Sequence, residues 1–289
     1  MYLCESVDRH GELNWEEFSR AWFRIVRRIL FGDAAREDHR LSKIMFQLRS
    51  AANWAFLRPQ RRNMRQQLLD RIRRYLSRAD PDSLAGVMEQ THATSRTAPE
   101  QQVPQWLFAF DPAGLTTFRT LALLASHPEY ARHVREEIGS RHSLSTEYMP
   151  HARAAVLESL RLWPTTPFVL RESTTATAWE TGILPADTSI LIFTPFFHRD
   201  DQHLPYADRF SPGLWSNPQP QGWPLIPFSE GPATCPGRNL VLLVSTAMLA
   251  AILDRARVRL KRPTRLMAGE PLPATLNHFG LRFELKSLC

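Results

Sequence analysis

The feature that most constrains this chain is a change of character near Pro164. Before it, apolar residues recur at helical spacing in several long segments. Between residues 164 and 236 lie many of the 22 prolines, together with two short β-branched runs. A segment that is apolar almost all round, and so predicts a buried helix, follows at residues 237–256. A long irregular stretch inside a domain is typical of chain that wraps around something. The order predicts a mainly α fold with small β-sheets.

The boundaries of the expected elements follow from the same periodicity. Amphipathic helices are expected at residues 14–31, 36–52 and 60–78, a long apolar segment at 104–126, and further helices at 129–139 and 149–163. Strands are expected at residues 168–174 and 189–194, and further edge strands in the alternating tail after residue 257. The polar residues 93–103 are expected to form a loop or a frayed connection.

Composition limits the class of protein. The 289 residues suit one large domain or two average ones, and 43% hydrophobic residues provide a sizeable core. No apolar run reaches the length of about eighteen residues that a membrane span needs. The first residues lack the pattern of a signal peptide. The three cysteines, Cys4, Cys235 and Cys289, are too few and too irregular for a disulfide framework. We therefore expect a cytoplasmic protein without a membrane partner.

Charge is concentrated in the first third of the chain. The net charge is +7, and sixteen Lys or Arg lie between Arg20 and Arg78. Such a density is compatible with nucleic-acid binding or with docking of an acidic protein. Apolar residues interleave with these arginines at helical spacing, and no zinc finger or RNA-binding signature accompanies them. Solvated helix faces are therefore the favoured interpretation, and no nucleic-acid partner is expected.

Cys235 stands in an unusual context. It is framed by Gly231, Pro232, Pro236 and Gly237, directly before the expected buried helix. A loop of this kind can aim backbone N–H groups at the sulfur, and the start of a helix adds positive potential. Both effects favour the thiolate over the thiol. A thiolate is a strong axial ligand for haem iron. The alternative is a buried core cysteine, the commonest fate of this residue type.

The segment around this cysteine resembles the haem-binding loop of the cytochrome P450 family. The family pattern Phe-x-x-Gly-x-Arg-x-Cys-x-Gly is matched by Phe228, Gly231, Cys235 and Gly237, while Ala233 stands where the family has a basic residue. The resemblance implies that Phe228, Gly231 and Gly237 shape a haem site and that Cys235 binds the iron. It implies a single P450-like domain over residues 1–289. Its parts would be a helical part at 1–163, an irregular part at 164–236 and a last part at 237–289.

Two further matches lie upstream. Glu158 and Arg161 match the family's Glu-x-x-Arg helix, where residues three apart can pair. The family completes this pair with an arginine from a later segment; Leu214 stands at that position, and Arg209 is the nearest substitute. Arg171 occupies a place where family members often bind a haem propionate. The alternative for Arg171 is a surface charge on a strand.

The oxygen-activating helix of the family is the weakest match. Alignment places Asp111 at the family's acidic position, and Pro112 replaces its threonine. Thr116 and Thr117 follow about one turn later, and Thr116 is the candidate that we favour for the missing hydroxyl. Read without the resemblance, Asp111 is an N-cap followed by proline at the first helical position. In that interpretation a helix begins here. In the other, Pro112 kinks a longer helix.

The resemblance implies a soluble, bacterial-type haem-thiolate monooxygenase with haem b as its cofactor. A small lipophilic substrate would lie between residues 104–120 and 168–174, and electrons would come from a ferredoxin or flavodoxin. The matched region omits the front portion of the family's domain, so the fold is expected to be N-terminally truncated. The alternative is a degenerate scaffold without haem redox activity that acts as a binding or interaction protein. Nucleic-acid binding through residues 20–78 is the third hypothesis.

Overall fold

The chain divides into two units, and the boundary at Gly114 and Leu115 falls inside one long helix. The computed structural model describes residues 11–54, 57–92, 94, 96–140, 149–216, 225–263, 266 and 268–288. Cys4 and Cys289 lie outside these ranges. One unit is Glu16–Gly114, and the other is Leu115–Cys289 together with strand β1 (Glu12–Asn14). Each unit is described by itself.

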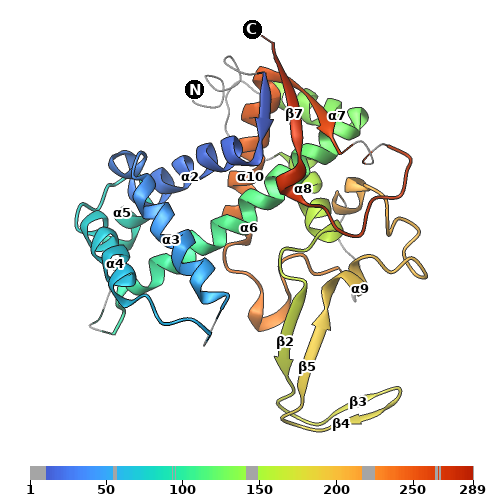
Figure 1. The fold of residues 1–289 in the computed structure, drawn as a ribbon. Coiled ribbons are helices and arrows are strands. Elements are labelled where there is room, and N and C mark those ends of the chain that lie inside the picture. The colour runs from blue at the N-terminus through green and yellow to red at the C-terminus, as the bar shows by residue number, and fades with distance from the viewer. Residues whose placement is uncertain are drawn as a thin grey trace. The chain divides into compact units, whose positions relative to one another are not determined.

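The first unit is helical. Its elements are α2 (Trp15–Phe31), a 3₁₀ turn (Asp33–Ala35), α3 (His39–Ala52), α4 (Arg62–Leu76), α5 (Leu84–Glu89) and the first part of α6 (Pro99–Ser126) (Figure 1). The expected helices 14–31, 36–52 and 60–78 are confirmed. The six residues of α5 are too few for a periodic pattern, and the sequence did not predict this helix.

The core of this unit forms along the apolar stripe of α2. The helix carries Glu16 and Glu17 in its first turn and Arg28 in its last, which matches the helix dipole. The indole N–H of Trp22 donates to the carbonyl of Phe110 on α6 at 2.8 Å. A Cβ at Gly114 would lie 2.8 Å from that indole nitrogen, so only glycine permits this close approach.

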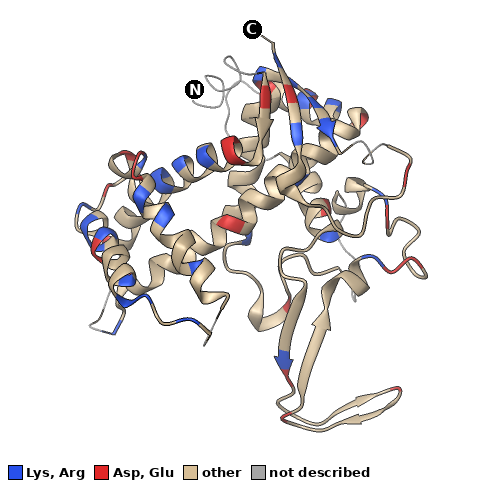
Figure 2. Cartoon of the chain, in the orientation of Figure 1, with Lys and Arg blue, Asp and Glu red and all other residues tan. Residues whose placement is uncertain are grey.

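Much of the positive charge lies on α2, α3 and α4 (Figure 2). Several of these arginines form ion pairs within the unit. Arg27, in contrast, is buried and donates to the carbonyl of Arg36 and the hydroxyl of Ser42. The exposed ion pairs include Arg20–Glu16 at 2.9 Å, Arg28–Asp33 at 2.9 Å and Arg73–Asp70 at 3.0 Å. This arrangement is that of solvated helix surfaces.

Helix α6 corrects two expectations. Residues 99–103 belong to the helix rather than to a loop, because Pro99 opens it and Val103 is buried while Gln101 and Gln102 face solvent. Pro104 and Pro112 both lie inside the helix. Asp111 is therefore not an N-cap, and the interpretation in which a helix begins there is wrong.

The second unit combines helices with small sheets. Its helices are the second part of α6, α7 (Pro128–Gly139), α8 (Pro150–Leu162), α9 (Thr194–His198) and α10 (Arg238–Arg255), with a 3₁₀ turn at Pro212–Trp215. The buried side chains of α8 and α10 contribute much of its core, so the prediction of a buried helix at 237–256 is confirmed. Among the described residues, no helix has the length and hydropathy needed to cross a bilayer.

The described strands form three antiparallel sheets. One has the order β1–β7–β6, with β7 at Arg282–Ser287 and β6 at Ala256–Arg262, and the tail therefore forms strands as expected. Strand β1 pairs Leu13 with Phe283. It has three residues and a partner at the far end of the sequence, so no local pattern could reveal it.

The other two sheets are strand pairs, seen at the bottom of Figure 1. Strand β2 (Phe168–Glu172) pairs with β5 (Ser189–Phe193), and β3 (Thr177–Trp179) pairs with β4 (Gly182–Leu184). The two strands predicted from the β-branched runs are thus each other's partners. One face of the β2–β5 pair exposes apolar side chains, which are Phe168, Leu170, Leu191 and Phe193.

Candidate functional site

Cys235 lies in a loop whose base is closed by backbone hydrogen bonds. The N–H of Cys235 donates to the carbonyl of Phe228 at 2.8 Å. Between these residues, Gly231–Ala233 form one 3₁₀ turn, and both the N–H and the hydroxyl of Thr234 donate to the carbonyl at its start. The two family positions Phe228 and Cys235 are therefore joined directly, and the loop holds the cysteine in one place.

Two residues of this loop adopt left-handed backbone conformations. Gly231 has φ = 66° and Ser229 has φ = 63°. The first is free of strain because glycine has no Cβ. The second is strained for a side-chain-bearing residue, and strain of this kind persists where the surrounding contacts hold it. The contact that holds Ser229 comes from Arg171, described below.

The loop leads into α10, which begins directly after Gly237. The N–H of Arg238 donates to the carbonyl of Cys235 at 3.2 Å, and that of Val241 donates to the carbonyl of Gly237 at 2.8 Å. The positive end of a long helix therefore follows the cysteine, as the sequence predicted. The N–H groups of Ser229 and Cys235 donate to carbonyls rather than to the sulfur.

The sulfur of Cys235 belongs to a half-buried free thiol. A Cβ at Gly237 would lie 3.8 Å from this sulfur and 3.9 Å from Val241. Its backbone has φ = −83°, which any residue adopts, so the chain conformation does not require glycine there. What glycine provides is open space beside the sulfur.

Arg171 reaches the same loop from strand β2. Its Nη2 donates to the hydroxyl of Ser229 at 2.6 Å, and its Nη1 donates to the carbonyl of Leu170 at 2.8 Å. The side chain is half-buried. Arg171 is therefore a link between β2 and the cysteine loop, which distinguishes it from an isolated surface charge. Its role toward a haem propionate stays a prediction.

Glu158 and Arg161 form a fully buried ion pair on α8. Arg161 Nη2 lies 2.7 Å from Glu158 Oε1, Arg161 Nε lies 2.9 Å from Glu158 Oε2, and both side chains have 0% exposure. Arg161 also donates to four carbonyls at 2.7–3.2 Å, those of His198, Tyr206, Ala207 and Arg209. One guanidinium thus fixes the irregular chain between α9 and the 3₁₀ turn at Pro212–Trp215.

The third side chain that contacts Glu158 is Trp215, whereas the sequence analysis expected Arg209. The indole N–H of Trp215 donates to Glu158 Oε2 at 2.9 Å, and the N–H of Ser211 donates to Oε1 at 2.9 Å. Arg209 is exposed and contributes its carbonyl, which accepts from Arg161. The indole next to Leu214 thus satisfies the carboxylate that the family satisfies with an arginine. The sequence did not predict Trp215 because the family pattern led us to expect an arginine as the partner of Glu158.

His198 connects this cluster to the cysteine loop. Its carbonyl accepts from Arg161 Nη1 at 2.7 Å, and its Nε2 accepts from the N–H of Ile226 at 2.9 Å. Ile226 lies two residues before Phe228, whose carbonyl holds Cys235. Hydrogen bonds through His198 therefore link Arg161 on α8 to Ile226, two residues before the base of the loop. Nothing in the local sequence around His198 indicates this role.

His198 is held neutral by its surroundings. Burial, followed by the charge of Arg161, lowers the pKa of His198 to about 4. Because Nε2 accepts a hydrogen bond, the neutral ring carries its proton on Nδ1, and this buried atom has no partner among the described residues. Protonation of Nε2 would break the hydrogen bond to Ile226 and place a second cation beside Arg161.

We expect the stability of the protein to fall when the pH drops from about 6.5 to about 4. In this window the unfolded chain binds a proton at His198 that the folded chain does not, so the free energy of unfolding decreases with acidity. The contribution of His198 is at most roughly 3 kcal/mol, for a pKa difference of about 2.5 units. The measurement is urea unfolding of the native chain and of His198→Gln across this range. Gln can still accept from Ile226 but does not titrate, so its stability should change less with pH. Parallel pH profiles of the two proteins would contradict the assignment.

The two candidate proton-handling residues lie on α6. Asp111 forms an ion pair with Arg49 of α3, within the first unit. Thr116 is buried in the second unit, with 2% exposure, and its carbonyl accepts from the hydroxyl of Thr120 at 2.8 Å. Their roles in catalysis stay predictions. The pairing with Arg49 is a feature that the sequence did not indicate.

The residues of this loop fit a haem-thiolate ligand set. One thiol is fixed by the loop, the space beside it is kept open by Gly237, and Arg171 brings a guanidinium to the same loop. Ala233 is exposed and offers no charge where the family has a basic side chain. In the described part of the chain, no group of three His, Cys, Asp or Glu could hold a metal. The fixed thiol of Cys235 fits iron that a prosthetic group holds and one cysteine ligates.

Comparison with known proteins identifies one protein family. A model of the Cytochrome P450 family matches residues 61–270. The chain is 30% identical over 193 residues to Cyclooctat-9-en-7-ol 5-monooxygenase of Streptomyces melanosporofaciens, which covers 62% of this chain and 42% of that protein. It is 32% identical over 152 residues to Beta-amyrin 24-hydroxylase of Glycine max, which covers 47% of this chain and 30% of that protein.

The fold has a close counterpart among solved structures. The cyanobacterial protein described as retinoic acid bound CYP120A1 matches with a TM-score of 0.80 at 18% identity, over 99% of this chain and 72% of that one. The curated relatives are longer. Cytochrome P450 monooxygenase FCK2 of Fusarium pseudograminearum is 30% identical over 151 residues, 47% of this chain and 27% of that protein. The chain thus spans roughly a quarter to two fifths of the length of the relatives cited here.

Proposed function

Because the chain belongs to the cytochrome P450 family, we propose that it is a haem-thiolate monooxygenase with Cys235 as the axial ligand of haem b. The observation that carries the proposal is the loop Phe228–Cys235, closed by a 2.8 Å hydrogen bond and followed by the start of α10. Bound haem supplies the activation of O₂, with electron density pushed from the thiolate. The residues of the chain supply the thiolate, its surroundings and the protons.

Several residues around Cys235 have separate roles in this proposal. Phe228 and Gly231 hold the cysteine at the end of the loop, and Gly237 leaves space beside the sulfur. Arg171 provides a guanidinium for a propionate. In this proposal the carboxylate of Asp111 and the buried hydroxyl of Thr116 are the groups that accept and donate protons. Asp111 forms an ion pair with Arg49.

Arg171 gives a direct test of the propionate assignment. We expect Arg171→Gln to raise the rate of haem loss by about tenfold, because a charge-assisted hydrogen bond at a half-exposed site is replaced by a neutral one. Arg171→Lys keeps the charge and should lose haem more slowly than the Gln variant. The measurement is haem transfer to an excess of an apo-globin. Glu172→Gln, the next residue on β2, is the matched control. Equal rates for Arg171→Gln and the native chain would remove Arg171 from the haem site.

The substrate in this proposal is a small lipophilic molecule. Supporting it, the β2–β5 pair that carries Arg171 exposes an apolar face, including Phe168 and Phe193, whose stacked rings lie 5.1 Å apart. The names of two relatives point to cyclooctat-9-en-7-ol and β-amyrin, and a solved structure of similar fold holds retinoic acid. These compounds are built on isoprenoid skeletons, so terpenoids are the first class to test as substrates.

The electron donor in this proposal is a ferredoxin or flavodoxin in a bacterial cytoplasm. Such donors are acidic, and the arginine-rich surfaces of α2 and α4 offer charge complementarity. Complementary charge raises the rate of association at low ionic strength. Electron transfer from a ferredoxin should therefore slow as salt is added, which stopped-flow reduction measures.

One experiment decides between a haem enzyme and a scaffold. Purified protein is supplied with haem, passed over a desalting column, and assayed for haem and iron. The proposal requires one haem and one iron per chain. With a reductase system and ¹⁸O₂, it also requires one labelled oxygen atom in the product. Iron far below one per chain would overturn it.

A scaffold without haem is the second candidate. It would act as a binding or interaction protein. The observation that favours it is the exposed Ala233, which leaves the cysteine loop without the basic side chain of the family. The iron assay separates the candidates, because a full complement of iron excludes the scaffold.

A further inference from the structure

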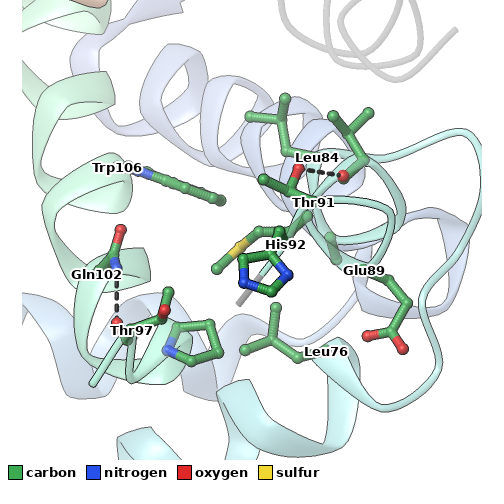
Figure 3. Close-up of a pocket in the computed structure, with 12 residues that line it drawn as sticks. Leu76, Leu84, Glu89, Thr91, His92, Thr97, Gln102 and Trp106 are labelled. Atoms are coloured by element: carbon green, nitrogen blue, oxygen red, sulfur yellow. Dashed lines mark hydrogen bonds between the residues drawn. The ribbon is translucent and has the colours of Figure 1, made fainter. Parts of the chain in front are cut away.

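A cavity of about 610 Å³ lies within the helical unit Glu16–Gly114, and the function proposed for Cys235 does not use it. Its size is in the range of pockets that hold small organic molecules. Figure 3 shows its walls, which come from the end of α4, from α5, from the turn after α5 and from the first turns of α6. The cavity is therefore formed by four segments of the unit that pack around it.

The walls of this cavity are mainly apolar. Leu76 of α4, Leu84 and Met88 of α5 and Trp106 of α6 line it, and all four side chains are half-buried. Helix α5 buries only Ala85 and Gly86 among its six residues. The remaining apolar side chains of α5 therefore have no core to fill, and Leu84 and Met88 contribute to the cavity wall instead. Such a wall gains free energy when an apolar body covers it.

Most polar groups at this cavity are already engaged. The hydroxyl of Thr91 donates to the carbonyl of Val87 at 3.0 Å, and Gln102 Nε2 donates to the carbonyl of Thr97 at 2.6 Å. His92 differs. Its ring lies in the middle of the group of side chains in Figure 3, and it makes no hydrogen bond or ion pair with the residues that the structure describes. His92 is thus available to bind one polar group of a ligand.

The charges around the cavity limit what that ligand can be. Its lining contains no Lys or Arg, and Glu89 is its one carboxylate. A ligand with a carboxylate would therefore have no Lys or Arg to pair with, and the carboxylate of Glu89 would repel it. A neutral ligand with an apolar body and one hydroxyl matches the walls and can exchange a hydrogen bond with His92 in either direction.

We propose that the cavity between α4, α5 and α6 is a binding site for a neutral lipophilic alcohol, with His92 bound to the hydroxyl. Leu84, Met88 and Trp106 enclose the apolar body. The site lies in one unit and Cys235 in the other, and we expect it to be occupied with or without haem. It is a ligand site additional to that of the proposed monooxygenase.

Calorimetric titration of the full chain with farnesol tests the proposal, with farnesene as the ligand that lacks the hydroxyl. We expect saturable binding of one farnesol at this site. Leu84→Trp fills the cavity and should weaken that binding at least about tenfold, while Leu288→Trp, an exposed position outside the lining, should leave it unchanged. His92→Ala should weaken farnesol binding by about two- to tenfold, the effect of one hydrogen bond, and farnesene binding by less than about twofold.

Farnesol binding to Cys235→Ala separates a failure of this proposal from a failure of the haem proposal, because this variant lacks the proposed iron ligand. Binding of farnesol that persists in Cys235→Ala and weakens in Leu84→Trp supports the site. Absence of saturable binding, or equal affinity in Leu84→Trp and the native chain, overturns it. If Leu84→Trp loses its helical circular dichroism, Met88→Trp takes its place as the filling variant. Loss of binding in Cys235→Ala alone would place farnesol at the iron instead and also overturn the proposal.

Discussion

Replacing Arg161 with alanine should lower the free energy of unfolding by about 3–5 kcal/mol, the usual cost of removing one partner from a buried ion pair. The variant leaves the carboxylate of Glu158 at 0% exposure without the two hydrogen bonds that the guanidinium of Arg161 donates to it. It also leaves four carbonyls without the donor that holds them. Since natural domains are stable by only about 5–15 kcal/mol, this loss is a large share of the total.

Urea unfolding followed by circular dichroism measures this effect. The matched control is Arg132→Ala on α7, an arginine with 68% exposure whose pairing atom lies 3.7 Å from Glu136. An exposed pair of this kind contributes less than about 1 kcal/mol. Arg161→Lys should fall between the two, because lysine keeps the charge but lacks the planar fork that meets Glu158 in two places. Equal stabilities of Arg161→Ala and Arg132→Ala would show that the cluster does not organise the unit.

Replacing Cys235 with alanine should reduce the affinity for haem by about a hundredfold or more. Changes in residues that only orient a metal ligand cost about 10- to 100-fold in affinity, so loss of the one protein ligand must cost at least as much. The fold should survive, because the side chain is half-buried and the backbone bond from Cys235 to Phe228 needs no sulfur. Titration of the haem-free protein with haem, followed by absorbance, measures the affinity.

The other two cysteines of the sequence supply the control for this prediction. Cys4→Ala together with Cys289→Ala removes two sulfur atoms, one more than Cys235→Ala, and it should leave the affinity for haem unchanged. A comparable loss in this control would show that haem binds through thiols in general. Unchanged affinity in Cys235→Ala would remove Cys235 from the iron.

The fold was largely predictable where local patterns carry the information. The stripe of α2 and the apolar surface of α10 are periodic over many residues, and both helices lie where the sequence places them. Strands β2 and β5 were visible as β-branched runs. Strand β1 and helix α5 were not, because three and six residues are too few to show a period. The start of α6 was missed because its first turns are polar on an exposed face.

The candidate site was predictable where side chains define it and unpredictable where backbone groups do. Cys235, Phe228 and Arg171 follow from a motif and a strand position. The path through His198 depends on a carbonyl and on the N–H of Ile226, which any residue type provides. The indole N–H of Trp215 donates the hydrogen bond to Glu158 that the family takes from an arginine. A search for a positive charge could not find this neutral donor. The ion pair that engages Asp111 with Arg49 joins two helices distant in sequence.

The central claim is that Cys235 binds haem iron as a thiolate, and a carbon monoxide difference spectrum of the reduced, haem-supplied chain tests it most directly. A thiolate ligand shifts the main absorption band of the carbon monoxide complex to about 450 nm because it donates electron density to the iron. We predict this band for the native chain and its absence in Cys235→Ala. A native chain that binds haem without this band, or a variant that keeps it, would contradict the claim.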